Sequence, residues 1–106
     1  MIYELKKYVP NGGKSQALKD RFEKVTLPIF ARVGVKVAHV FENPAEPEAL
    51  YYLTCFKDEA ERDAAWKAFG ADAEWKAAKA ASEVDGPLLG SQSSIDLVPT
   101  RFSPQQ

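Results

Sequence analysis

The order of strand-like and helix-like segments is the sequence feature that most limits the fold of this chain. Alternating β-forming residues bounded by turn residues predict four strands, at residues 2–9, 35–41, 50–56 and 90–99. Two helical regions, at residues 14–33 and 58–82, separate the first strand from the second and the third from the fourth. With right-handed crossovers, this β-α-β-β-α-β order predicts an α+β, ferredoxin-like antiparallel sheet with strand order 4-1-3-2, helices on one face and a bare opposite face.

The first helical region carries one apolar face that ends at Gly34. The apolar positions recur in steps of four, three, four and four, and they are Leu18, Phe22, Val25, Ile29 and Val33. Pro28 lies inside this region and removes a backbone donor, which predicts a kink or a loosened turn at residues 26–30. Residues 42–49, rich in Pro and Glu, predict an exposed loop between two antiparallel strands.

The second helical region contains both tryptophans, nine residues apart in the similar phrases AAWKA and AEWKA. In one uninterrupted helix, this spacing places Trp66 and Trp75 on opposite sides, since each residue turns the helix by about 100°. Gly70 as a stop and Asp72 as a cap instead predict two short helices, which lets both tryptophans turn inward. The pair is therefore interpreted as scaffold and not as a binding site.

Composition restricts the functions open to the chain. Its 106 residues predict a single domain, residues 1–106, with an extended polar tail at residues 99–106. The 14 basic and 15 acidic residues form no basic stripe, which argues against nucleic acid as a partner. A lone Cys55 and a lone His39 predict neither a disulfide nor a metal site, and no cofactor is expected. No leader-like or long apolar segment is present, which predicts a cytoplasmic protein without a membrane span.

Candidate site residues follow from the two faces of the predicted sheet. Because side chains alternate along a strand, Leu5, Ile95 and Leu97 are assigned to the helix face. The pattern does not decide the second and third strands, where we favour the bare face for His39 and Tyr52. The candidate pocket-lining residues on the bare face are Glu4, Lys6, Tyr8, His39, Tyr52, Gln92 and Ser94.

This mixture of aromatic and polar groups suits neither open water nor a dry core. Two such sheets facing each other in a homodimer would enclose a cavity with convergent polar groups, as small-molecule pockets have. The alternative is a solvated sheet face, or a polar dimer interface without a ligand. His39 is the candidate proton shuttle if chemistry occurs, although a single strand histidine is more often hydrogen-bonded structure, and no catalytic residue is assigned.

Four stretches of the chain together resemble the NIPSNAP family. They are MIYELKKYVPNGGK, LPIFARVGVKV, AERDAAWKAFGADAEWKA and LLGSQSSIDLVPTRFSP, and they cover nearly the whole sequence. The resemblance implies the dimeric α/β barrel fold. The positions that match the family pattern are Tyr3, Glu4, Tyr8, Trp66, Asp72, Trp75 and Gln92. The chain departs from it at Lys6, where the family often has Arg, and at Ser93, where it often has Glu; Lys lacks the planar fork that a bidentate anion contact needs.

The resemblance implies little about activity. Some eukaryotic members of the family are mitochondrial proteins linked to membrane traffic and organelle clearance, and fold relatives include cofactor-independent monooxygenases. Two hypotheses follow. The first is a homodimer with a small-molecule pocket, acting as a binding protein or a cofactor-free enzyme. The second is a non-catalytic structural or protein-interaction module that docks through residues 42–49 or the tail. A third reading, RNA binding on the sheet, is disfavoured by the charge balance and by the lack of an RNP-like motif.

Overall fold

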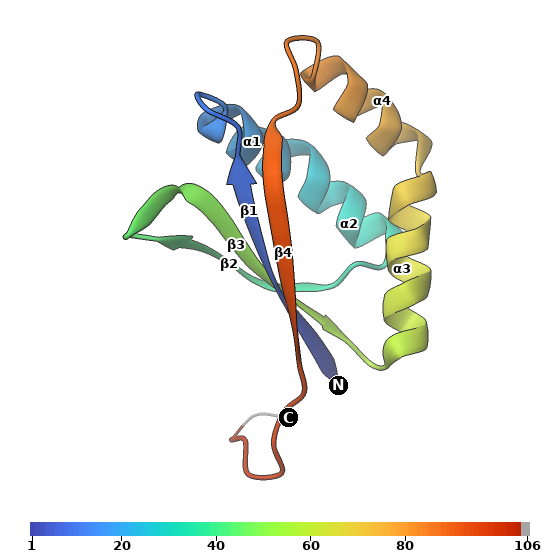
Figure 1. The fold of residues 1–106 in the computed structure, drawn as a ribbon. Coiled ribbons are helices and arrows are strands. Elements are labelled where there is room, and N and C mark those ends of the chain that lie inside the picture. The colour runs from blue at the N-terminus through green and yellow to red at the C-terminus, as the bar shows by residue number, and fades with distance from the viewer. Residues whose placement is uncertain (105–106) are drawn as a thin grey trace.

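Strands and helices follow one another in the predicted order, and the computed structural model describes residues 1–104. The strands are β1 (Ile2–Pro10), β2 (Val37–Asn43), β3 (Glu46–Phe56) and β4 (Leu89–Leu97). The helical elements are α1 (Ser15–Arg21), η1 (Phe22–Thr26), α2 (Leu27–Val33), α3 (Glu59–Ala71) and α4 (Ala73–Ser82). Figure 1 shows α1 and α2 behind the sheet, and α3 and α4 forming an arc beside β4.

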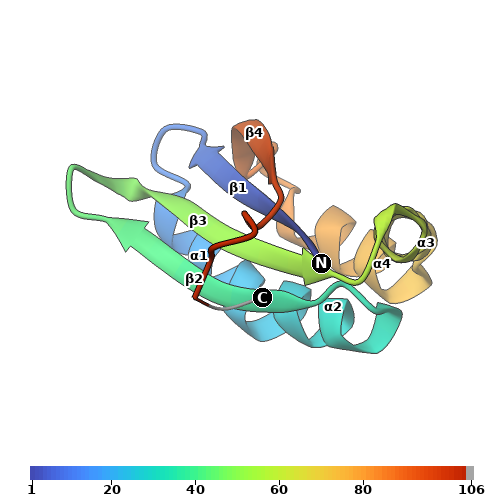
Figure 2. The same ribbon diagram turned by 90° about the horizontal axis from the view of Figure 1, so that it is seen from below.

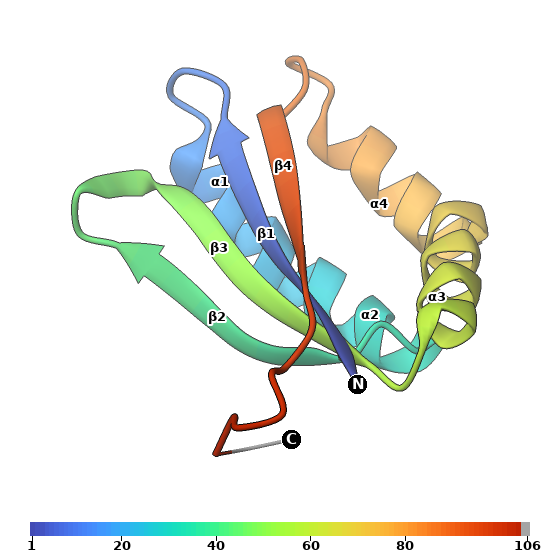
Figure 3. The same cartoon turned by 60° about the horizontal axis from the view of Figure 1, so that its bottom comes forward.

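The strands form one antiparallel sheet in the order β2-β3-β1-β4, which confirms the predicted ferredoxin-like topology. The central strand β1 pairs with β3 on one side and with β4 on the other. Helices cover one face of this sheet, and the opposite face carries none, as Figures 2 and 3 show. This opposite face is called the bare face below.

The core lies between the sheet and the helices and is rich in aromatic rings. Phe30 of α2 and both Tyr52 and Phe56 of β3 have at most 1% of their surface exposed. The ring of Phe30 packs edge to face against Phe22 and Trp66, at centroid distances of 5.9 and 5.5 Å. These contacts join η1, α2 and α3 to one another, because aromatic side chains bury large apolar areas and favour this geometry. Phe30 also packs against Tyr52 of β3, with ring centres 5.9 Å apart.

The first helical region is interrupted, as Pro28 predicts. A π-helical turn, η1, separates α1 from α2, and Pro28 lies in the first turn of α2. Because proline has no N–H, the carbonyl four residues earlier lacks its usual helical donor. Wider hydrogen bonding accommodates this, with the N–H of Leu27 donating to the carbonyl of Phe22. The interruption lies about one turn before the predicted residues 26–30.

The break between the two tryptophans is also confirmed. α3 ends at Ala71 and α4 begins at Ala73, and the carboxylate of Asp72 accepts a hydrogen bond of 2.8 Å from the backbone N–H of Trp75. The chain therefore changes direction at the cap, as predicted. Gly70 remains inside α3 and does not end it.

The predicted loop at residues 42–49 was wrong. The structure extends β2 to Asn43 and starts β3 at Glu46, so that the turn comprises Pro44 and Ala45. The side chain of Asn43 accepts a hydrogen bond of 2.9 Å from the N–H of Ala45, which closes the turn locally. Proline-rich sequence therefore forms a tight hairpin here instead of an open loop.

Replacing Gly34 with alanine is expected to lower the free energy of unfolding by about 1–2 kcal/mol. Gly34 ends α2 with a left-handed φ of 98°, and an added Cβ would meet only Ala65, at 3.9 Å, so the cost comes from the backbone and not from a clash. Urea denaturation of both proteins measures the difference. Gly12→Ala is the matched control: its Cβ would meet nothing within 4 Å and its φ is not positive, so we expect unchanged or slightly increased stability.

Candidate functional site

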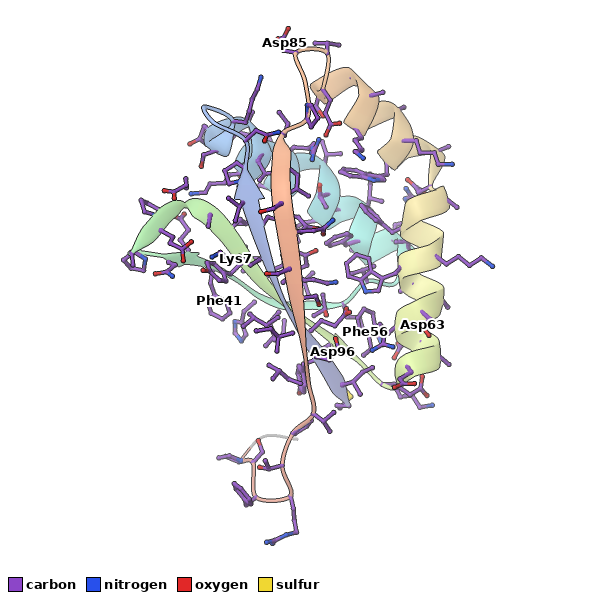
Figure 4. All side chains as sticks on the ribbon, in the orientation of Figure 1. Lys7, Phe41, Phe56, Asp63, Asp85 and Asp96 are labelled. Atoms are coloured by element: carbon purple, nitrogen blue, oxygen red, sulfur yellow. The ribbon has the colours of Figure 1, made fainter. Side chains whose placement is uncertain are left out.

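The structure reverses the predicted face assignment of β1. Glu4, Lys6 and Tyr8 point towards the helices, where they contact side chains of α3 and η1. Leu5 therefore lies on the bare face, and the prediction that it faces the helices was wrong. Figure 4 shows the same division on other strands, with Phe56 and Asp96 on the side of α3 and Phe41 on the opposite side of the sheet.

The neighbouring strands follow the reversal of β1. Tyr52 and Ser94 flank Lys6 in register, and Gln92 lies opposite Tyr8, so these side chains share the helix side of the sheet. The bare-face assignment of all six candidates on β1, β3 and β4 was therefore wrong, although their grouping on one face was right. The face assignment of Ile95 and Leu97 was likewise wrong, because they share the bare face with Leu5.

His39 lies apart from the other candidates. Its partner in the β2–β3 register is Leu53, and its ring stacks on Phe41 with centroids 5.5 Å apart. These contacts place His39 on the bare face, as favoured, and it is exposed there. It therefore has no access to the polar groups on the helix side.

Glu4 is the centre of a buried polar network on β1. Only 6% of its surface is exposed. One carboxylate oxygen accepts hydrogen bonds from the indole N–H of Trp66 at 2.7 Å and from the hydroxyl of Thr54 at 3.1 Å. The other lies 3.5 Å from the ammonium group of Lys6, which sits 4.7 Å from the centre of the Trp66 ring. These partners compensate for the loss of hydration, and they explain why a carboxylate occurs beneath a helix.

Tyr8 and Tyr52 form a pair whose hydroxyl oxygens lie 2.6 Å apart. Tyr52 is completely buried, and among residues 1–104 its hydroxyl has no other hydrogen-bond partner. If Tyr8 were the donor, the proton of Tyr52 would be buried without an acceptor, so we assign Tyr52 as the donor. The hydroxyl proton of Tyr8 is then free to donate elsewhere. Burial raises the pKa of both phenols, which keeps them neutral at physiological pH.

A pocket of about 430 Å³ lies beside this pair, between the β1–β4 side of the sheet and the helices. Its size falls in the range of small-molecule sites. Aromatic rings from α3, α4 and η1 form much of the wall, and polar groups come from β1, β4, α1, η1, α4 and the segment after α4. The residues that line it are Tyr8, Leu18, Arg21, Phe22, Thr26, Trp66, Phe69, Trp75, Lys79, Glu83, Pro87, Leu89 and Gln92.

The charged part of the pocket is an ion pair between Arg21 and Glu83. The Nη1 atom of Arg21 donates to the Glu83 carboxylate at 2.9 Å and to the Ser82 hydroxyl at 3.0 Å. The guanidinium also lies 5.1 Å from the ring centre of Trp75. The cation thus lies over an aromatic ring and is paired with a carboxylate, a cation–π arrangement that arginine favours.

Acid is expected to destabilise the wild-type protein more than the Glu83→Gln variant. The hydrogen bond from Arg21 lowers the pKa of Glu83, so its contribution to stability is complete above the unfolded-state pKa of about 4.3 and disappears as the pH falls through the lower folded-state value. Thermal melts between about pH 6 and pH 3 should show that the melting temperatures of wild type and Glu83→Gln converge at low pH. Glu74→Gln, which removes an exposed carboxylate from α4, is the control. A constant difference between wild type and Glu83→Gln at every pH would contradict the assignment.

Of the seven predicted site residues, Tyr8 and Gln92 line this pocket, whereas its charged groups, Arg21, Lys79 and Glu83, were not predicted. Arg21 follows Leu18 by three residues and precedes Phe22, so a charged residue interrupts the apolar stripe of the first helix. That interruption was the available signal. The tryptophans, interpreted as scaffold, both line the pocket as well.

Within residues 1–104, no three His, Cys, Asp or Glu side chains come together as a metal site would need. None of the helices in this described part has the length and apolar composition required to span a membrane.

Comparison with known proteins agrees with the fold. The sequence profile of the NIPSNAP family matches residues 3–104. Among curated proteins, none matches the chain. A NIPSNAP family protein from Agrobacterium tumefaciens str. C58 superposes with a TM-score of 0.84 at 23% identity, covering 99% of this chain and 98% of that one.

Two further solved structures share the architecture. An uncharacterised NIPSNAP domain protein from Burkholderia xenovorans has a TM-score of 0.82 at 22% identity, over 98% of this chain and 99% of its own. A putative antibiotic biosynthesis monooxygenase from Bacteroides thetaiotaomicron has a TM-score of 0.64 at 17% identity, over 92% and 88% of the two chains. At these identities the likeness establishes the fold and carries no reaction with it.

Proposed function

Because this chain belongs to the NIPSNAP family, and solved members of that family include uncharacterised proteins and one of unknown function, we propose a function from its own geometry. The protein is a small-molecule-binding domain that works as a homodimer. Its ligand site is the pocket on the helix side of the sheet, and the bare face forms the dimer interface. The proposal keeps the pocket and the dimer expected from sequence, but it assigns them to opposite faces.

The main support for a binding function is that one pocket combines aromatic walls with a hydrogen-bond donor, the hydroxyl of Tyr8. Trp66 and Trp75 each present a large ring to the pocket of about 430 Å³. Tyr8 adds a hydroxyl proton that its partner Tyr52 leaves unused. Small-molecule sites combine mostly apolar walls with a few oriented polar groups, and this pocket has both.

The bare face supports the homodimer. Leu53, Leu5 and Ile95 lie side by side on three adjacent strands in this face. Phe41 and Ile95 have 46% and 56% of their surface exposed. The apolar row therefore faces solvent in the monomer, and exposed apolar patches on small domains mark interaction sites. A second copy would offer the same surface, as a two-fold interface requires.

A protein-interaction module is the second candidate function, and the tail favours it. Val98 and Phe102, which follow β4, are 71% and 76% exposed. Figure 1 shows this segment projecting beyond the end of the sheet. Such side chains provide apolar anchors for a partner. Residues 105 and 106 of the predicted tail lie outside the described residues.

A fragment screen by ligand-observed NMR tests the proposed pocket. Gln92 on β4 borders the pocket, so Gln92→Trp is expected to fill part of it and to abolish most hits seen with the wild-type protein. Ala77→Trp adds the same bulk at an exposed position of α4 that does not line the pocket, and it should keep the hits.

The screen also separates the two candidate functions. A wild-type protein that binds no fragment, or a Gln92→Trp variant that keeps every hit, would contradict the pocket. In either case, loss of partner binding on deletion of residues 99–106 would support the interaction module.

A further inference from the structure

Arg21 is a buried guanidinium with unused donors. Only 9% of its surface is exposed, and its Nη1 atom serves both Glu83 and Ser82. Among residues 1–104, neither Nε nor Nη2 of Arg21 has a hydrogen-bond acceptor. In the same part of the chain, every fully buried side-chain nitrogen or oxygen has a hydrogen-bond partner. These two atoms therefore reach open space. Arg21 is one of the residues that line the pocket.

The guanidinium is held in one orientation. Its central carbon lies 5.1 Å from the centre of the Trp75 ring, and Glu83 and Ser82 both accept from Nη1. The edge that carries Nε and Nη2 thus stays available without the loss of side-chain freedom that an exposed arginine would suffer. Two parallel N–H donors on such an edge match the two oxygens of a carboxylate.

Tyr8 provides a third donor in the wall of the same pocket. Its hydroxyl proton is free because Tyr52 donates to its oxygen. Burial raises the pKa of Tyr8, and the positive charge of Arg21 partly offsets that rise. A neutral phenol and a guanidinium together favour an oxyanion over a cation.

The rest of the pocket agrees with an anionic, flat ligand. Its charged residues are Arg21, Lys79 and Glu83, two cations and one anion, so the wall carries one net positive charge. Trp75 and Phe69 lie with ring centres 4.8 Å apart and tilted by 31°, which gives the wall an extended aromatic surface. Aromatic surfaces of this kind stack on planar ligands.

We propose that the pocket binds small organic carboxylates with a planar apolar body, whose carboxylate accepts from Arg21 and Tyr8 while the body packs on the aromatic wall. This inference rests on the proposed function, because it names the ligand class of the same pocket.

Naphthoate and naphthamide are suitable probes, because they share one shape and differ in charge. Each is titrated into the full chain while heteronuclear NMR follows the two tryptophan indole N–H signals. Both tryptophans line the pocket, so both signals report on occupancy. We expect naphthoate to bind about tenfold more tightly than naphthamide, since charge-assisted hydrogen bonds are about twice as strong as neutral ones.

Paired variants test the two polar groups without removing the buried arginine. Tyr8→Phe should weaken the binding of naphthoate about fivefold. Tyr3→Phe changes a residue on the bare-face side of the same strand and should leave that binding unchanged. Glu83→Gln should tighten the binding of naphthoate about threefold, because it removes the negative charge that competes with the ligand for Arg21. Glu74→Gln removes the same charge from a carboxylate of α4 that does not line the pocket and should have little effect.

The outcomes separate this inference from the proposed function. Naphthoate preference with the expected response of Tyr8→Phe and Glu83→Gln supports it. Equal binding of the two probes, or a Glu83→Gln variant that weakens naphthoate, overturns the carboxylate inference but leaves the pocket as a binding site. If neither probe shifts the indole signals while the fragment screen gives hits, the inference fails alone; if the screen also gives none, both fail.

Discussion

Replacing Glu4 with alanine is expected to lower the free energy of unfolding by about 3 kcal/mol. The carboxylate is buried and serves three groups at once, the Trp66 indole, the Thr54 hydroxyl and the Lys6 ammonium. Its removal leaves the Trp66 indole N–H without its acceptor and a largely buried cation without a counter-charge, and each of these costs free energy. The Thr54 hydroxyl keeps only the backbone carbonyl of residue 4, at 3.4 Å. Denaturant unfolding followed by far-UV circular dichroism measures the loss.

The matched control for Glu4 is an exposed carboxylate in a strand. Glu48→Ala on β3 removes a side chain that faces solvent and should change stability little. Glu4→Gln keeps an oxygen for the indole and the hydroxyl but loses the charge, so its stability should lie between that of Glu4→Ala and wild type. Equal stability of Glu4→Ala and Glu48→Ala would contradict the network described for Glu4.

Leu5→Asp is expected to convert the proposed homodimer into a monomer at micromolar concentration. Leu5 lies between Leu53 and Ile95 in the centre of the bare face, so a two-fold interface would bury the new carboxylate in each subunit. An unpaired buried charge costs several kcal/mol, and a two-fold dimer would bury two of them, one from each subunit. Sedimentation velocity over a range of concentrations measures the change in self-association.

The control for Leu5→Asp places the same charge on the surface of a helix, away from the bare face. Ala77→Asp adds a carboxylate to an exposed position of α4, and this variant should remain dimeric. Circular dichroism must show that Leu5→Asp is still folded, because Leu5 is partly covered already in the monomer. A wild-type protein that sediments as a monomer would contradict the dimer itself.

Local pattern was sufficient to predict most of the secondary structure. The apolar spacing from Leu18 to Val33, the left-handed stop at Gly34 and the cap at Asp72 are all determined by residues within a few positions of one another. Such signals act through backbone geometry and hydrogen bonds between neighbouring residues, so they can be recognised without knowing which distant residues are in contact. The hairpin at Pro44 was missed because the closing hydrogen bond from Ala45 to Asn43 depends on the conformation of the turn and not on the composition of the stretch.

The faces of the sheet were harder to predict, because alternation gives two sets of side chains and does not say which set the helices cover. The predicted core side of β1 depended on a single aliphatic residue, Leu5. The helix side instead holds Glu4 and Lys6, because Trp66 from α3 supplies an indole donor and an aromatic face to satisfy them. That contact joins residues far apart in the chain, and no local pattern contains it.

The sequence by itself determined the order of the elements, the topology of the sheet and the shared face of six of the seven candidate polar side chains, His39 being the exception. Each of these follows from periodicity, capping and the right-handed crossover, which are properties of the chain alone. Only the tertiary structure decided which face those side chains occupy and that Arg21 joins Tyr8 beside the two tryptophans. The physical reason is that a buried charge is tolerated only where distant groups supply its hydrogen bonds, and those partners come together only when the chain has folded.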